Sequence, residues 1–204
     1  MNIPYRALAY RFVRRTGPAS YFDRLYTMSR DPFRLETSPY DVRKRERLME
    51  VVTRRPTVMA LDAGCGTGII ARMLAEHCDH VIAIDFSAQA VSRARAHNDR
   101  PERLDIRHAD LTDLSLAERF DLVVCSEVLY YLEGAMLEAA VQGIRSVCQP
   151  DARFVAVLPA RKEAAVMERI SEHFRITEQV RFRDRWRPYS ITLCEPISAM
   201  PSQS

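Results

Sequence analysis

The chain has 204 residues, of which 47% are hydrophobic and 28% charged, and its formal net charge is +3. This composition is typical of one globular domain and excludes a disordered or fibrous protein. No apolar run reaches the roughly 20 residues that span a bilayer, so we expect no membrane association. The net charge is too small to indicate nucleic-acid binding, although the first acidic residue is Asp23.

The five cysteines are widely scattered, and none stands in a Cys-x-x-Cys pair. They are Cys65, Cys78, Cys125, Cys148 and Cys194. This pattern predicts neither a disulfide framework nor a zinc site, and it is typical of a reducing compartment. The chain also starts without the apolar stretch of a secretory signal, so we expect a cytoplasmic protein.

The N-terminal part of the chain predicts helices. Residues 4–15 carry apolar side chains at helical spacing with arginines beside them, which indicates an amphipathic helix lying on the core. Lid, membrane and targeting roles remain alternatives for this basic segment. Thr16-Gly17-Pro18 and Asp31-Pro32 predict breaks, and Ser38-Pro39 predicts an N-cap followed by a helix over residues 40–52.

Short apolar strands then alternate with helices. The expected strands are residues 58–61, 81–84, 104–107, 122–125 and 154–158, and the expected helices are 69–77, 87–97, 136–148 and 162–173. Residues 175–182 and 190–194 have no helix between them and should pair as an antiparallel edge hairpin. The fold class is therefore predicted as α/β, a doubly wound and mostly parallel sheet covered on both faces.

A glycine loop follows the first strand and directly precedes a helix. Gly64, Gly66 and Gly68 place backbone N–H groups and a helix N-terminus at the carboxyl edge of the sheet. A dinucleotide fingerprint would need glycine where the chain has Ile69, and the phosphate loop is absent. Asp62 suits a ligand with an amino group and repels phosphates. The loop thus favours S-adenosylmethionine, which has an amino acid end, over a dinucleotide.

Polar residues also end the next three strands. Asp85 stands where an acid accepts hydrogen bonds from ribose hydroxyls. Asp110 and Leu111 offer a polar partner and an apolar contact for adenine. Ser126 and Glu127 lie at the rim where a reacting methyl group would be expected.

Residues 61–68 and 81–85 closely resemble the class I S-adenosylmethionine-dependent methyltransferases, and the match runs from about 58 to 158. The resemblance implies the strand order 3-2-1-4-5-7-6 and S-adenosyl-L-homocysteine as the product. It places the loop, with Cys65, under the methionine part, Asp85 and Phe86 at the ribose, and Asp110 and Leu111 at adenine. We expect a helical lid over 1–55, the cofactor-binding domain over 56–195 and a disordered tail over 196–204.

Four further segments resemble the nodulation protein S (NodS) family, whose members N-methylate the free amine of a chitooligosaccharide. They are residues 31–34, 37–41, 126–132 and 159–161. Because methyl transfer needs a lone pair on the acceptor, Glu127 is the candidate for handling the acceptor proton, or else for orienting the acceptor or the cofactor amine without titrating. Tyr130, Tyr131 and Arg161 are candidate acceptor contacts, and Tyr40 is a candidate contact of the cofactor carboxylate.

Other functions stay open at this point. An O-methyltransferase of a small metabolite is one alternative, and an RNA methyltransferase using the Arg-flanked Trp186 is a weaker one. An NAD-dependent oxidoreductase is disfavoured by Ile69 and Asp62. We expect no metal, because the segment His77 to His80 lies at the opposite sheet end and lacks a fourth ligand. The expected partner is a small-molecule or oligosaccharide acceptor, with no obligate protein partner.

Overall fold

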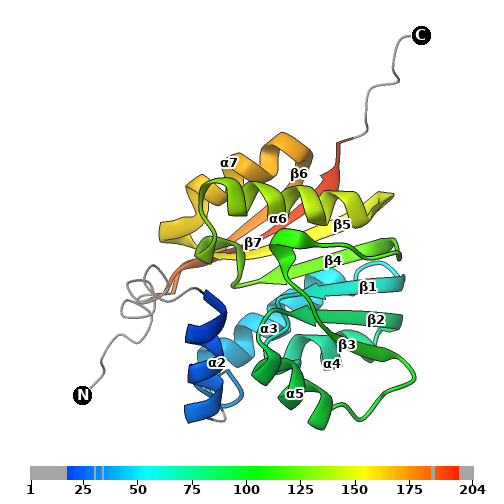
Figure 1. Cartoon of the computed structure of the whole chain (residues 1–204). Coiled ribbons are helices and arrows are strands. Elements are labelled where there is room, and N and C mark those ends of the chain that lie inside the picture. The colour runs from blue at the N-terminus through cyan, green and yellow to red at the C-terminus, as the bar shows by residue number, and fades with distance from the viewer. Residues whose placement is uncertain (1–17, 30, 34, 185–186, 198–204) are drawn as a thin grey trace.

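The computed structural model describes residues 18–29, 31–33, 35–184 and 187–197. The predicted helix over 4–15, Trp186 and most of the predicted tail lie outside these residues. A seven-stranded sheet with the order β3-β2-β1-β4-β5-β7-β6 forms the centre of the fold (Figure 1). The predicted strand order and fold class are confirmed.

Five strands run parallel and the last two form the expected antiparallel hairpin. Their bounds are β1 Thr57–Ala63, β2 Cys78–Asp85, β3 Leu104–His108, β4 Phe120–Ser126, β5 Cys148–Pro159, β6 Phe174–Phe182 and β7 Tyr189–Pro196. β7 pairs antiparallel with both β5 and β6. The strands β1, β2, β4 and β5 have buried, almost continuously apolar segments, as a sheet covered on both faces requires, whereas the edge strand β3 alternates apolar and polar residues.

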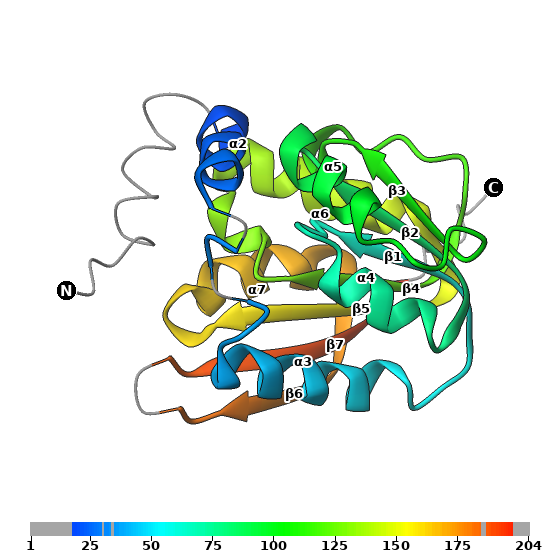
Figure 2. The same cartoon turned by 90° about the horizontal axis from the view of Figure 1, so that it is seen from below.

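Helices cover both faces of the sheet (Figures 1 and 2). The helices are α2 Pro18–Met28, α3 Pro39–Val52, α4 Ile69–Ala75, α5 Ala88–Ala96, α6 Gly134–Val147 and α7 Glu163–His173, with short 3-10 turns η1 Leu111–Asp113, η2 Leu129–Tyr131 and η3 Ala160–Lys162. α6 and α7 bury their apolar sides on one face, whereas α3, α4 and α5 cover the other. None of the helices in the described part of the chain is long and apolar enough to cross a bilayer.

The strand order reverses at β1, which pairs with β2 on one side and β4 on the other. At such a switch point, the connections that leave the carboxyl ends of the two central strands go to opposite faces and leave a crevice between them. The glycine loop after β1 and the segment after β4 both leave the sheet here. The fold therefore brings together the two segments to which the sequence assigned the chemistry.

Helix α2 was not predicted from the sequence, because Gly17-Pro18 was interpreted only as a break. Proline is compatible with the first turn of a helix, where its missing N–H has no partner to lose, and α2 begins at Pro18. Phe22 and Tyr26 form the buried side of this helix and pack with Ala90 of α5. α2 thus lies against the N-terminal end of α5, beside the carboxyl edge of the sheet (Figure 2).

A buried arginine fixes the connection between α3 and β1. Arg153 on β5 is 4% exposed and donates to the carbonyl of Val52 at 2.8 Å and to the hydroxyl of Thr57 at 2.5 Å. We expect Arg153→Met to lower the free energy of unfolding by about 2 kcal/mol, because it leaves buried acceptors without a donor. Urea denaturation would measure this. Arg55→Met, at an exposed neighbouring position, is the matched control, and an equal loss there would contradict the assignment.

Candidate active site

The glycine loop turns sharply because three of its residues adopt positive φ angles. Gly64, Gly66 and Gly68 have φ of 85°, 55° and 77°. A Cβ at Gly64 would meet Val128 Cγ2 at 2.4 Å, and one at Gly66 would meet the Tyr26 hydroxyl at 3.0 Å. Gly68 begins α4 and faces Ala94 of α5 instead, so its role is helix packing. Only Gly64 and Gly66 bring the backbone close to a pocket.

The carboxylate of Asp85 connects the second strand to the glycine loop. It accepts hydrogen bonds from the backbone N–H of Gly66 at 2.8 Å and of Ser87 at 2.9 Å. Burial raises the pKa of Asp85, and these two N–H groups oppose the rise. The side chain lines both of the pockets that meet at this point.

Asp62 lies inside the core instead of facing the ligand pockets. It is 1% exposed and is absent from the lining of both pockets at the glycine loop. The backbone N–H of Ala71 in α4 interacts with its carboxylate, whose Oδ2 has no hydrogen-bond partner among the described residues. Strand alternation turns this carboxylate towards α4, whereas the sequence pattern predicts that it points into the pocket.

Burial, with the nearby charge of Asp85, raises the pKa of Asp62 to about 7. A carboxyl group with a raised folded-state pKa loses its contribution to stability as pH rises from its unfolded value towards the folded one. We expect the stability of the ligand-free protein to fall between about pH 4 and 7, by up to roughly 1.4 kcal/mol per pH unit from this group. Urea denaturation of Asp62→Asn should show a shallower slope, and an unchanged slope would contradict this assignment.

The first pocket lies between the glycine loop, β4 and α3. Glu127 follows β4 and is the one non-glycine residue with a positive φ, 63°, in the described ranges. Its carboxylate receives Lys44 Nζ at 2.9 Å on Oε1 and the Tyr130 hydroxyl at 2.8 Å on Oε2. Lys44 is almost completely buried and also pairs with Asp41 at 3.0 Å. The contacts with Lys44 and Tyr130 fix the direction of the Glu127 carboxylate.

Aromatic rings from α2 and the following loop close this pocket. Phe22, Tyr26 and Phe33 line it together with Tyr131. The Phe22 ring contacts those of Phe86 and Tyr131 edge-on, with centroids 5.5 and 5.3 Å apart. These rings form an apolar wall of the pocket that contains Glu127.

The second pocket is more apolar and lies beyond Asp85. Its lining residues are Phe22, Gly64, Ile84, Asp85, Phe86, Ala109, Asp110, Leu111, Thr112, Val128, Tyr131, Leu132 and Met136. Asp110 is exposed, and its Oδ1 caps η1 by accepting from the backbone N–H of Thr112 at 2.8 Å. The shared residues, among them Gly64 and Tyr131, make the two pockets one continuous site.

The family model of nodulation protein S (NodS) matches residues 23–174. The chain belongs to the NodS family. The fold agrees: the crystal structure of N-methyltransferase NodS from Bradyrhizobium japonicum WM9, in complex with S-adenosyl-L-homocysteine, superposes with a TM-score of 0.79. That match covers 88% of this chain and 98% of the other, and at 23% identity it shows a shared fold.

Curated relatives give the same family. Nodulation protein S of Bradyrhizobium diazoefficiens is 32% identical over 123 residues, which are 59% of each chain. The dTDP-3-amino-3,6-dideoxy-alpha-D-glucopyranose N,N-dimethyltransferase of Streptomyces fradiae is 34% identical over 93 residues, 45% of this chain and 35% of that protein. The NodS-like chain thus spans about a third to three fifths of the length of these relatives.

The NodS family is one of S-adenosylmethionine-dependent methyltransferases, and the residues of the two pockets fit that cofactor. Side chains at Gly64 and Gly66 would fill the space along the loop. The carboxylate of Asp85 stands where the two pockets meet, which suits hydroxyl groups and would repel a pyrophosphate. The apolar second pocket suits a purine ring.

Two predicted site residues lie elsewhere in this NodS-like fold. The hydroxyl of Tyr40 donates to the carbonyl of Arg187 at 2.7 Å, and its ring lines a separate pocket on α3. Arg161 is exposed on η3 and lines neither of the two pockets at the glycine loop. In contrast, Cys65, Ser126, Tyr130 and Tyr131 do line the first pocket.

Sequence reasoning missed Lys44 and the rings of α2. Lys44 belongs to a run of charged residues that was interpreted mainly as a solvated face, with one member at most on a ligand. The signal available in the sequence was its position one helical turn after Tyr40 and three residues after Asp41, which puts the three on one side of α3. Nothing in the sequence indicated that this side faces Glu127.

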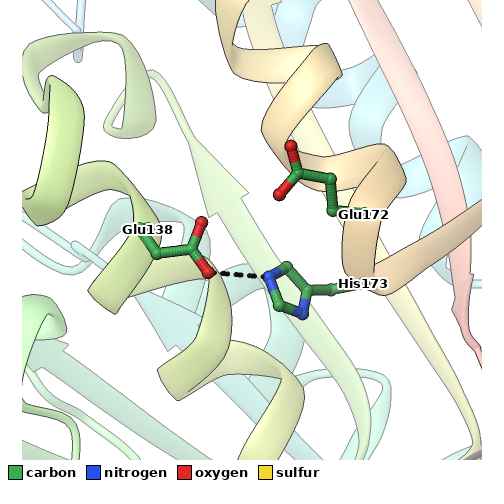
Figure 3. Close-up of side chains that lie close together, drawn as sticks. All are labelled: Glu138, Glu172 and His173. Carbon is green, nitrogen blue, oxygen red and sulfur yellow. Dashed lines mark hydrogen bonds and ion pairs between the residues drawn. The ribbon is translucent and has the colours of Figure 1, made fainter.

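A cluster of Glu138, Glu172 and His173 joins α6 and α7 away from this site (Figure 3). Glu138 and His173 face each other with 3.0 Å between Oε1 and Nε2. Arg169 pairs with Glu138 at 2.9 Å and with Glu172 at 2.6 Å. Because a guanidinium already stands between the two carboxylates, the cluster is explained as a helix-to-helix ion pair network.

Proposed function

We propose that the protein transfers the methyl group of S-adenosylmethionine to the free amine of an amino sugar or a chitooligosaccharide-like molecule. The observation that carries the proposal is the Glu127 carboxylate, which lines the same pocket as Gly64 and Gly66. S-adenosylmethionine supplies an electrophilic methyl group on its sulfonium. The chain then needs to orient an acceptor lone pair in line with that methyl group and accept a proton.

Glu127 is suited to receive the proton of an ammonium acceptor. The amine must lose its proton before its lone pair forms the new N–C bond while the S–C bond breaks. Lys44 and Tyr130 hold the carboxylate in a fixed position, so the group does not have to reorient during the reaction. Orientation of the acceptor without proton transfer would use the same contacts and remains the alternative role of Glu127.

Aromatic side chains support a sugar as the acceptor. The rings of Tyr130 and Tyr131 are tilted by 37° with their centroids 4.4 Å apart, and their hydroxyls lie 3.2 Å apart. Such surfaces contact the apolar faces of sugar rings and also offer hydrogen bonds. We assign α2 and the loop after it as a lid, since Phe22 and Phe33 close the pocket.

The test uses purified protein, methyl-labelled S-adenosylmethionine and paired acceptors. A chitooligosaccharide with one free amine and glucosamine should be labelled, whereas the fully N-acetylated oligosaccharide should not. Catechol and RNA represent the O-methyltransferase and RNA alternatives. Label on catechol or RNA alone would contradict the proposal, and so would equal labelling of the N-acetylated control.

A further inference from the structure

A third pocket, which we call the arginine hollow, lies between the start of α3 and the end of the β6–β7 hairpin. Its lining residues are Tyr40, Arg43, Arg47, Arg181, Phe182, Arg183, Asp184 and Tyr189. In the antiparallel pair of β5 and β7, Tyr189 lies opposite Pro159, the last residue of β5. This end of the hairpin therefore lies at the carboxyl edge of the sheet. The hollow therefore lies at the same edge of the sheet as the first pocket, which contains Glu127 and is called the catalytic pocket below.

The arginines of this hollow exceed the acids that could neutralise them. Arg43 and Arg183 are exposed and make no hydrogen bond or ion pair with another side chain in the described part of the chain. Arg181 pairs with Glu163 at 3.0 Å. Asp184 is the one acid in the lining, and its Oδ1 accepts from the backbone N–H of Arg187 at 3.1 Å. An anion would relieve the repulsion between the remaining guanidinium groups.

Aromatic contacts hold part of this charge in a fixed position. The guanidinium of Arg47 lies 4.4 Å from the centroid of the Phe182 ring and donates to the Tyr189 hydroxyl at 3.1 Å. Phe182 and Tyr189 stack with centroids 4.9 Å apart. A guanidinium oriented in this way is suited to a phosphate, because its planar N–H groups match two oxygens at once.

One lysine separates the hollow from Glu127. Lys44 Nζ lies 5.0 Å from the centroid of the Tyr40 ring and 5.8 Å from that of Tyr189, and it bonds Glu127 at 2.9 Å. Tyr40 and Tyr189 line the hollow, whereas Lys44 and Glu127 line the catalytic pocket. A single layer of side chains therefore lies between the arginines and the carboxylate at which the acceptor amine would bind.

We propose that the arginine hollow binds a phosphate or diphosphate group of the methyl acceptor, so that the substrate class is a phosphorylated amino sugar. This inference rests on the proposed amine methyltransferase function and narrows it. An uncharged oligosaccharide would leave the guanidinium groups of Arg43 and Arg183 without a counterion. Because the hollow lies at the same edge of the sheet as the pocket of Glu127, a substrate that passes over the side chains between them could place its amine at Glu127 and its phosphate at the arginines.

The first part of the test compares acceptors with the full chain. Glucosamine 1-phosphate and UDP-glucosamine carry the same free amine as glucosamine. The first adds one phosphate, and the second adds a diphosphate together with uridine. We expect the kcat/KM of a phosphorylated acceptor to exceed that of glucosamine at least tenfold, and this ratio to decrease with salt. Arg43→Gln combined with Arg183→Gln should reduce the ratio to near one. Arg103→Gln, an exposed arginine before β3, should leave the ratio unchanged.

The second part titrates pyrophosphate by calorimetry at low salt, which reports on the hollow without methyl transfer. The double variant should bind pyrophosphate at least tenfold more weakly than the wild-type protein, and Arg103→Gln should not. Labelled glucosamine with no preference for phosphorylated acceptors would overturn this inference and leave the proposed function intact. Absence of label on every amine would contradict the proposed function. An unchanged affinity for pyrophosphate in the double variant of Arg43 and Arg183 would overturn the anion site itself.

Discussion

Gly64→Ala is expected to weaken the binding of S-adenosylmethionine at least about a hundredfold, which corresponds to about 2.7 kcal/mol. A Cβ at this position meets Val128 Cγ2 at 2.4 Å, and φ is 85°, where alanine is strained. Gly64 and Val128 line both halves of the site, so a displaced Val128 would enter the space of the ligand. Calorimetric titration would measure the loss.

Gly134→Ala is the matched control for this variant. Gly134 also has a positive φ, 54°, but a Cβ there would meet no atom within 4 Å. Both variants carry backbone strain, and Gly64→Ala alone adds the steric conflict. We expect unfolding penalties of about 1 kcal/mol for the control and about 3 kcal/mol for Gly64→Ala. Equal affinities for the cofactor in the two variants would show that Val128 does not limit the site.

Glu127→Gln is expected to reduce the rate of methyl transfer by about 10²- to 10⁴-fold while the cofactor affinity changes little. Proton transfer by a positioned side chain contributes an acceleration of this size. Glutamine keeps the shape of the side chain but cannot accept a proton at neutral pH. Single-turnover kinetics with a labelled amine acceptor would measure the rate, and titration of S-adenosyl-L-homocysteine would measure binding.

Two further variants separate proton transfer from orientation. Glu127→Asp keeps the charge, so it should recover part of the rate if the carboxylate accepts the proton. Tyr130→Phe removes one hydrogen bond to the carboxylate and leaves the ion pair with Lys44 in place. It should have a smaller effect than Glu127→Gln. A Glu127→Gln variant with a wild-type rate would leave Glu127 with no role in proton transfer.

The sheet could be predicted from the sequence because its evidence is local. Four of the five parallel strands contain a short apolar run, and the glycine loop after β1 fixes the switch point. Ser38-Pro39 likewise predicted the start of α3. The side chain of Ser38 caps the helix by accepting from the backbone N–H of Asp41, and proline takes the first helical position. The same rule would have located α2 if Pro18 had been interpreted as a start.

The site residues could be predicted only where the backbone alone fixes their position. Asp85 and Ser126 lie at strand ends, so the strand order alone brings them together. The contact between Lys44 and Glu127 joins residues 83 positions apart, and it depends on which side of α3 faces the sheet. The orientation of the Asp62 side chain could not be predicted for a related reason. The face on which its carboxylate lies is set by the strand register and not by the motif.

The position of Phe22 links the two halves of the site energetically. Its ring contacts Phe86 in the half suited to adenine and Tyr131 beside the acceptor. A cofactor that orders Phe22 would therefore order Tyr131 as well. The acceptor would then bind with a smaller loss of side-chain conformational entropy. Thermodynamic linkage makes this effect reciprocal: each ligand should raise the affinity for the other by the same factor.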